Sequence, residues 1–257
     1  MLETQEDIIN FIKFHAEFVN SNKEKILTSD EKLKSRWLWG LGTNAQAAAL
    51  GYLMLNDRNS ALTWLNKSAE FYFRCMQSYD KTKLYFGISE SFTETIALQV
   101  MKSIILSGNK NLINETANYI VKNQPEISMS SDLIYNYVIA VSMIITRGER
   151  LNEDLNEQLK KLSVSEEKHG GNVTGYYAGT SFALEGIAQN NKEKILNGVN
   201  KMLFSFSKHL SRTKDIPLCL DAVMILLVAK NKEIEIDVQK EIHENYKKYI
   251  PLCLFYV

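Results

Sequence analysis

Histidine side chains often act as bases and metal ligands, and this chain has few of them. The four histidines, His15, His169, His209 and His243, lie far apart, and none belongs to an HExxH motif or another compact ligand pair. His15 falls on the apolar stripe of the first expected helix, so we expect it to be buried with one hydrogen-bond partner. The histidine pattern therefore predicts no metal site and no general base.

The three cysteines are also weak candidates for chemistry. Cys75, Cys219 and Cys253 are odd in number and widely spaced, no CxxC pair is present, and two of them lie in apolar runs. A cysteine nucleophile needs a nearby base or a helix start to form the thiolate, and nothing local supplies either. We expect buried free thiols in a reducing compartment.

Acidic and glycine-rich positions lead to the same interpretation. Glu90 and Glu94 are four residues apart at an expected helix start, where carboxylates favour the positive helix end; a general acid/base pair is the alternative. The glycines at Gly40-Leu41-Gly42 and in 170–179 do not form GxxxxGK[ST] after a strand, so a loop or close helix packing is expected. A GxSxG elbow and the RxxxxH spacing of helical ribonucleases are absent. We expect no catalytic residues, no cofactor and no enzyme activity.

Composition and charge limit the classes of partner. The 257 residues are 45% apolar, with 30 basic and 30 acidic side chains, so the chain can bury a large core but lacks the basic excess typical of nucleic-acid binding. The first residues lack the basic-then-apolar order of a secretory signal. The apolar stretches LIYNYVIAVSMII and AVMILLVA are shorter than the roughly 20 residues that cross a bilayer. These features predict a soluble cytoplasmic protein that contacts neither nucleic acid nor membrane.

Helical spacing dominates the chain, which has only three prolines. An apolar helix, a polar or glycine turn and a second helix recur about every 40 to 52 residues, with turns at Asn56-Asp57, Gly108-Asn109, Arg147-Gly148, Asn190-Asn191 and Asn231. This predicts an all-α array of antiparallel helical hairpins, a TPR-like bundle or solenoid, in a single domain over 1–257. We expect helices at 4–22, 29–39, 43–56, 59–78, 91–107, 110–123, 130–147, 152–162, 177–189, 191–210, 216–230 and 235–248.

Loop aromatics are the best candidates for contacts with a partner. We expect long loops at 78–91 and 163–177, where the aromatic pairs stand: Tyr85, Phe86, Tyr176 and Tyr177. A loop tyrosine is a common interface anchor because it combines a large apolar area with a polar tip. Packing into the core is the alternative for all four.

The order of segments resembles a known family. An aromatic and alanine-rich helix, WLWGLGTNAQAAALGYLMLNDRNSALTWLNKSAEFY, is followed by YYAGTSFALEGIAQNNKEKILNGVNKMLFSFSKHL, and the chain closes with IPLCLDAVMILLVAKNKEIEIDVQKEIHENYKKYIPLCL. This layout, from about 35 to 254, resembles the immunity protein 49 family of bacterial polymorphic toxin systems. The resemblance implies an all-α protein that neutralises a cognate toxin by binding it. Many immunity proteins are acidic whereas this chain is neutral, which makes a basic nuclease a less suitable toxin partner.

The sequence is consistent with three alternative functions. The first is a non-enzymatic binding protein of the immunity type, which binds a protein partner through a concave helical face or through the loops at 78–91 and 163–177. The second is a general helical-repeat scaffold for a peptide or a protein. The third is an α-helical enzyme whose pocket is built from distant residues.

Overall fold

All regular elements that the structure describes are helices, which confirms the all-α prediction. The structure, a computed structural model, describes residues 4–82, 93–124, 131–146, 153–169, 177–209 and 218–256. These residues form two compact units, an N-terminal unit up to 116 and a C-terminal unit from 117, with the division inside one helix. The prediction of a single domain over 1–257 stays a prediction.

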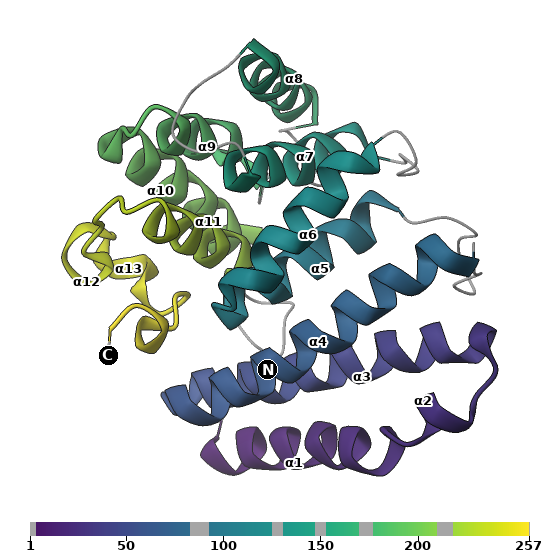
Figure 1. Ribbon diagram of the computed structural model, residues 1–257. Coiled ribbons are helices and arrows are strands. Elements are labelled where there is room, and N and C mark those ends of the chain that lie inside the picture. The colour runs from purple at the N-terminus through teal and green to yellow at the C-terminus, as the bar shows by residue number, and fades with distance from the viewer. Residues whose placement is uncertain are drawn as a thin grey trace. The chain divides into compact units, whose positions relative to one another are not determined.

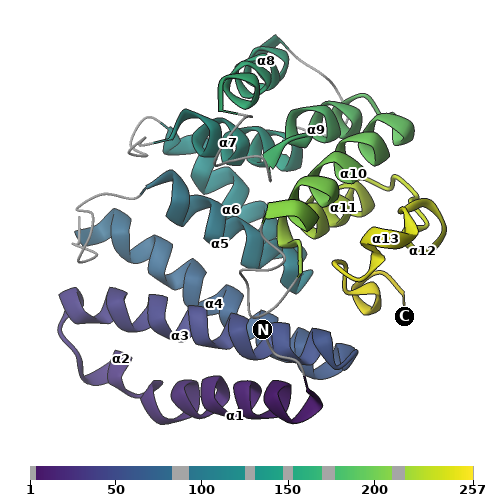
Figure 2. The same ribbon diagram turned by 180° about the vertical axis from the view of Figure 1, so that it is seen from behind.

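The N-terminal unit is a series of helices that pack on their neighbours in sequence. Helix α3 packs against α1, α2 and α4, and α4 also packs against α5 (Figure 1). The view from behind shows α1, α3 and α4 side by side as well (Figure 2). The helices are α1 (Gln5–Asn22), α2 (Lys25–Thr28), α3 (Glu31–Met54), α4 (Arg58–Thr82), α5 (Glu94–Ser107) and the start of α6 (Lys110–Lys122).

Small residues let α3 and α4 approach closely. The buried face of α3 is rich in alanine, and a Cβ at Gly42 would lie 3.1 Å from the Tyr72 ring. The predicted helices 29–39 and 43–56 are in fact one helix, α3. Gly42 lies inside this helix because the absence of a side chain makes room for the ring of Tyr72. Close helix packing, one of the two expected roles for this glycine-rich place, is therefore confirmed at Gly42.

The C-terminal unit packs its helices around two that are almost wholly buried, α7 and α11. Helix α7 contacts α8 and α9, while α10 contacts α9, α11 and α13 (Figures 1 and 2). After the end of α6, the elements are α7 (Asp132–Thr146), α8 (Glu153–His169), α9 (Thr180–Ala188), α10 (Lys192–His209), α11 (Leu220–Asn231), α12 (Val238–Glu241), α13 (Glu244–Lys247) and the short 3-10 helix η3 (Leu252–Leu254). No helix among the described ranges is long and apolar enough to span a membrane.

Two predicted element boundaries in this unit were wrong. Helix α8 continues to His169, so the first part of the expected loop at 163–177 is helical. The expected helix 235–248 is instead two short helices, α12 and α13. Asp237 caps the first by accepting a hydrogen bond from the Lys240 N–H, and the backbone leaves helical geometry at Ile242 (ψ 136°) before His243 caps the second.

One turn geometry recurs where helices end. Asn56, Gly108, Asn190 and Glu233 all have positive φ angles, between 52° and 70°. After three of them the next N–H donates to the carbonyl five residues earlier, which satisfies the end of the helix: Asp57 to Tyr52, Asn191 to Gly186, and Ile234 to Ala229. The predicted turns at Asn56-Asp57, Gly108-Asn109 and Asn190-Asn191 are confirmed. The turn expected at Asn231 is centred two residues later, and Arg147-Gly148 lies outside the described residues.

Candidate functional site

The loop aromatics do not form an exposed cluster in the described part of the chain. Tyr177 is buried, with 8% of its surface exposed, and its ring packs edge-on against Tyr137 at a centroid distance of 5.8 Å. Tyr177 is therefore a core residue, so at this position the structure favours the packing alternative over a surface contact. Tyr177 lies three residues before α9, and its carbonyl is held there by a hydrogen bond from the Thr180 hydroxyl. Tyr85, Phe86 and Tyr176 lie outside the described residues.

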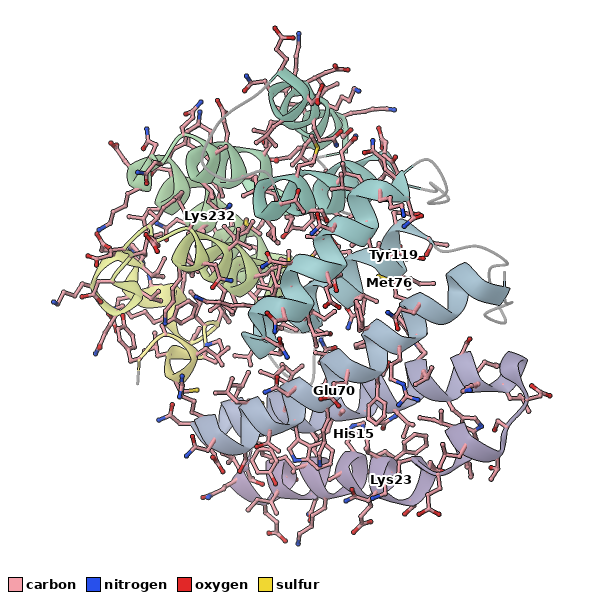
Figure 3. All side chains as sticks on the ribbon, viewed as in Figure 1. His15, Lys23, Glu70, Met76, Tyr119 and Lys232 are labelled. Atoms are coloured by element: carbon pink, nitrogen blue, oxygen red, sulfur yellow. The ribbon has the colours of Figure 1, made fainter. Side chains whose placement is uncertain are left out.

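His15 has a structural role, in line with the prediction of one hydrogen-bond partner. Its Nδ1 lies 2.6 Å from Asn44 Oδ1, so it links α1 to α3 (Figure 3). Its ring also packs edge-on against Phe11 and Phe14, with centroids 4.3 and 5.1 Å away. The ring is half-buried rather than buried, because Phe14 on its outer side is itself exposed.

The cysteines are free, as predicted, and two of the three are buried. Burial of Cys75 raises the pKa of its thiol well above the ordinary value, so the reactive thiolate is disfavoured. Cys253 is partly exposed. Within the ranges that the structure describes, no three His, Cys, Asp or Glu side chains come close enough to hold a metal ion.

Two carboxylates, those of Glu94 and Asp221, are buried in the part of the chain that the structure describes. Glu94 is the first residue of α5, which agrees with the expected role of an acid at a helix start. Its predicted companion Glu90 lies outside the described residues. Asp221, in the first turn of α11, lies near Tyr137, and burial together with this carboxylate raises the pKa of Tyr137 well above its ordinary value. A neutral phenol that stays protonated beside a carboxylate fits a structural contact better than an acid–base pair.

The most distinctive exposed feature is a set of phenylalanines and lysines on α9 and α10. Phe182 is 36% exposed and Phe204 is 47% exposed, which is unusual for rings of this size. The ammonium groups of Lys194 and Lys201 each lie 5.0 Å from the Phe182 ring centre, and that of Lys208 lies 4.0 Å from the Phe204 ring centre. We call these five residues the Lys–Phe face.

Helical spacing explains how the Lys–Phe face forms. The three lysines are seven residues apart along α10, so they follow one line on the helix surface. That line borders the packing contact with α9, where Gly198 meets Ala183, and this contact places Phe182 of α9 beside the lysines. Lys194 also forms an ion pair with Glu185 at 2.7 Å, whereas no described acid pairs with Lys201 or Lys208.

A carboxylate on a third helix fixes the start of α9. The two oxygens of Glu166, on α8, accept hydrogen bonds from the N–H groups of Gly179 at 2.5 Å and Ser181 at 2.9 Å. These are donors that no helical carbonyl can satisfy, and a negative charge at this end of a helix is favourable. Because Phe182 follows Ser181, this cap also fixes the position of the first ring of the Lys–Phe face.

The Lys–Phe face was not predicted from the sequence, because the apolar spacing of α10 was used only to identify buried positions. Leu203 and Phe206 on that stripe are fully buried, as the spacing predicts. The residue that could have indicated the exposed side of α10 is Phe204, an aromatic residue among polar positions. Such a face offers apolar area and positive charge for binding, and it has no nucleophile or acid–base pair of its own.

Comparisons of the chain with family models, with curated proteins and with solved structures found no match.

Proposed function

We propose that this chain is a non-enzymatic protein-binding protein that neutralises a cognate toxin by direct contact. The observation that carries the proposal is the Lys–Phe face on α9 and α10. Exposed aromatic rings held on rigid helices are typical of protein interfaces, because they bury a large area at low cost in side-chain entropy. The lysines over the rings add positive charge that a partner's carboxylates can meet.

The state of the reactive side chains supports binding rather than catalysis. The imidazole of His15 is held by Asn44, and burial keeps the Cys75 thiol protonated. The Lys–Phe face provides recognition by shape and charge. A helical array that offers one such face on adjacent helices is suited to hold a folded partner.

The resemblance to the immunity protein 49 family supports a toxin as the partner. In this proposal the chain acts in the cytoplasm, where a toxin would meet it, and the three free cysteines agree with a reducing compartment. Because the lysine line of α10 carries positive charge, a toxin surface with exposed carboxylates is a better match than a basic nuclease surface.

The test is co-expression with the products of neighbouring genes. Each neighbour that arrests growth when expressed alone is expressed together with this chain, and the pair is passed over a gel-filtration column. We expect growth to be restored and a complex to elute. If no neighbour is toxic, or if no complex survives, toxin neutralisation is wrong.

A pair of matched variants tests the Lys–Phe face. Lys201→Glu with Phe204→Ala should weaken the complex at least tenfold, because it removes one ring and reverses one charge. The control is Lys13→Glu with Phe14→Ala on α1, which changes an exposed lysine and a phenylalanine that is 67% exposed. If the α1 variant loses binding and the α10 variant keeps it, the face has been placed on the wrong helices.

A further inference from the structure

A groove of about 850 Å³ lies in the C-terminal unit, beside the end of α11. Its floor is apolar and includes Leu226, Ile234 and Val238, all of which are buried. Phe255 and Tyr256 form one wall, and segment 233–237 forms the other. Both segments belong to the yellow, C-terminal part of the chain in Figure 1. The groove is therefore built wholly within one unit.

Hydrogen bonds fix the wall formed by Phe255 and Tyr256. Lys230 Nζ donates to the Phe255 carbonyl at 3.1 Å. The Tyr256 hydroxyl donates to Asp237 Oδ1 at 2.8 Å, and it accepts from the Gln239 N–H at 2.8 Å. Because both residues of the wall formed by Phe255 and Tyr256 are held in this way, the groove can exist before a ligand arrives.

The charges around the groove are mainly negative and not all are neutralised. The lining contains three carboxylates, Glu233, Glu235 and Asp237, and one ammonium group, that of Lys230. Asp237 forms an ion pair with Lys240 at 3.1 Å. Glu233 and Glu235 are exposed, and no described cation pairs with either of them. Two carboxylates are thus available to a ligand.

These two carboxylates both line the groove, where the chain passes from α11 to α12. Glu233 and Glu235 are both exposed, whereas Ile234 between them is buried. Glu233 has a φ angle of 60° at the turn that ends α11, which fixes where its side chain leaves the backbone. An apolar floor, aromatic walls and paired carboxylates suit a cation with an apolar stem.

We propose that this groove binds an organic cation, a guanidinium or alkylammonium group on an apolar stem, with Glu233 and Glu235 holding the charge. The stem lies on Ile234 and Val238, and the rings of Phe255 and Tyr256 flank it. Such a group can be an arginine or lysine side chain of a protein partner or a free small molecule. This inference does not depend on the proposed function.

Calorimetric titration of the whole chain with N-butylguanidine tests the proposal, with N-butylurea as a neutral probe of the same shape. We expect the guanidinium probe to bind at least tenfold more tightly than the urea, and its affinity to fall as salt is added. The blocked tripeptide Gly-Arg-Gly is titrated in parallel. Tighter binding of the peptide than of N-butylguanidine identifies a protein side chain as the source, and the reverse order identifies a free molecule.

Variants locate the binding to the groove. Glu233→Gln and Glu235→Gln should each weaken binding of N-butylguanidine about tenfold, and the double variant should abolish it, while the circular dichroism spectrum stays unchanged. The control is Glu17→Gln, which removes an exposed carboxylate from α1. Equal binding of the urea and the guanidinium, or full affinity in the double variant, would overturn the proposal.

Discussion

Tyr72 illustrates, at the scale of a single residue, how the N-terminal unit keeps polar atoms in its core. Its ring is fully buried and packs edge-on against Trp39, with centroids 4.9 Å apart, while its hydroxyl lies 2.9 Å from the Thr43 hydroxyl. Nearby, Gln46 donates to the Ser103 hydroxyl at 2.6 Å and accepts from Gln99 at 2.5 Å. Each of these buried or partly buried polar groups has a protein partner, so the layer between α3, α4 and α5 is structural.

The pKa of Tyr72 predicts a loss of stability at alkaline pH. Burial raises this pKa from 10.0 to about 12, so the unfolded chain releases the proton first. The stabilisation is therefore complete below pH 10 and is lost as the pH rises through about 12. Urea unfolding at several pH values measures how far the free energy of unfolding falls as the pH rises. In Tyr72→Phe this fall should be smaller than in the wild type by on the order of 2 kcal/mol. Tyr246→Phe, at a half-exposed position, is the control. An identical decline in Tyr72→Phe would contradict the prediction.

At the scale of elements, the α9–α10 hairpin depends on backbone contact. A Cβ at Gly198 would lie 2.5 Å from the Ala183 nitrogen and 2.6 Å from the Gly179 carbonyl oxygen. Gly179 itself has a φ angle of 96°, which side chains other than glycine rarely allow. The expectation of close helix packing in the 170–179 stretch is thus confirmed at Gly179. The Lys–Phe face depends on this contact, since it brings Phe182 to the lysines of α10.

Gly198→Ala should destabilise the chain by about 2–3 kcal/mol, because the atoms in the way belong to the backbone and cannot move aside. The measurement is the free energy of unfolding in urea. Gly40→Ala is a matched control within α3, where a Cβ would meet nothing within 4 Å. That change should instead stabilise by about 0.5–1 kcal/mol through the higher helix propensity of alanine. Equal effects of the two substitutions would show that the helices are not in close contact at Gly198.

The carboxylate cap on α9 gives a second prediction at this scale. Glu166→Gln keeps the size of the side chain but removes the charge that faces two N–H groups at the helix start, so it should cost about 1–2 kcal/mol. Glu167→Gln, at the next and exposed position of α8, should change the stability by less than about 0.5 kcal/mol. Thermal melts of the three proteins compare these effects. A larger loss in Glu167→Gln would mean that the cap is assigned to the wrong carboxylate.

The sequence predicted elements better than it predicted the site. Turns at Asn56, Gly108 and Asn190 were found because asparagine and glycine readily adopt positive φ. Glu233 makes the same turn but was missed, since glutamate rarely does so. The site depends on which side of a helix stays exposed once neighbours pack, and apolar spacing does not settle this for an aromatic such as Phe204. Tyr177 shows the same ambiguity, because the sequence left both a surface contact and core packing open for an aromatic beside a loop, and the ring is buried.

At the scale of the whole molecule, the question is whether the two units unfold together, as the single-domain prediction requires. Each unit has its own apolar core: Leu65 of α4 is fully buried in the N-terminal unit, and Leu203 of α10 is fully buried in the C-terminal unit. Separate cores favour separate cooperative units, whereas the helix α6 that contains the division favours one.

Hydrogen exchange on Leu65→Asp distinguishes these cases. The substitution buries an unpaired charge and should destabilise the N-terminal unit by several kcal/mol. If the cores are separate, amides of α3 and α4 lose protection while those of α9, α10 and α11 keep most of theirs. Gly198→Ala is the reciprocal variant and should give the opposite pattern, because its contacts all lie in the C-terminal unit. Uniform loss of protection in both variants would instead establish one cooperative domain, and in that case a toxin bound at the Lys–Phe face would also stabilise α1 to α5.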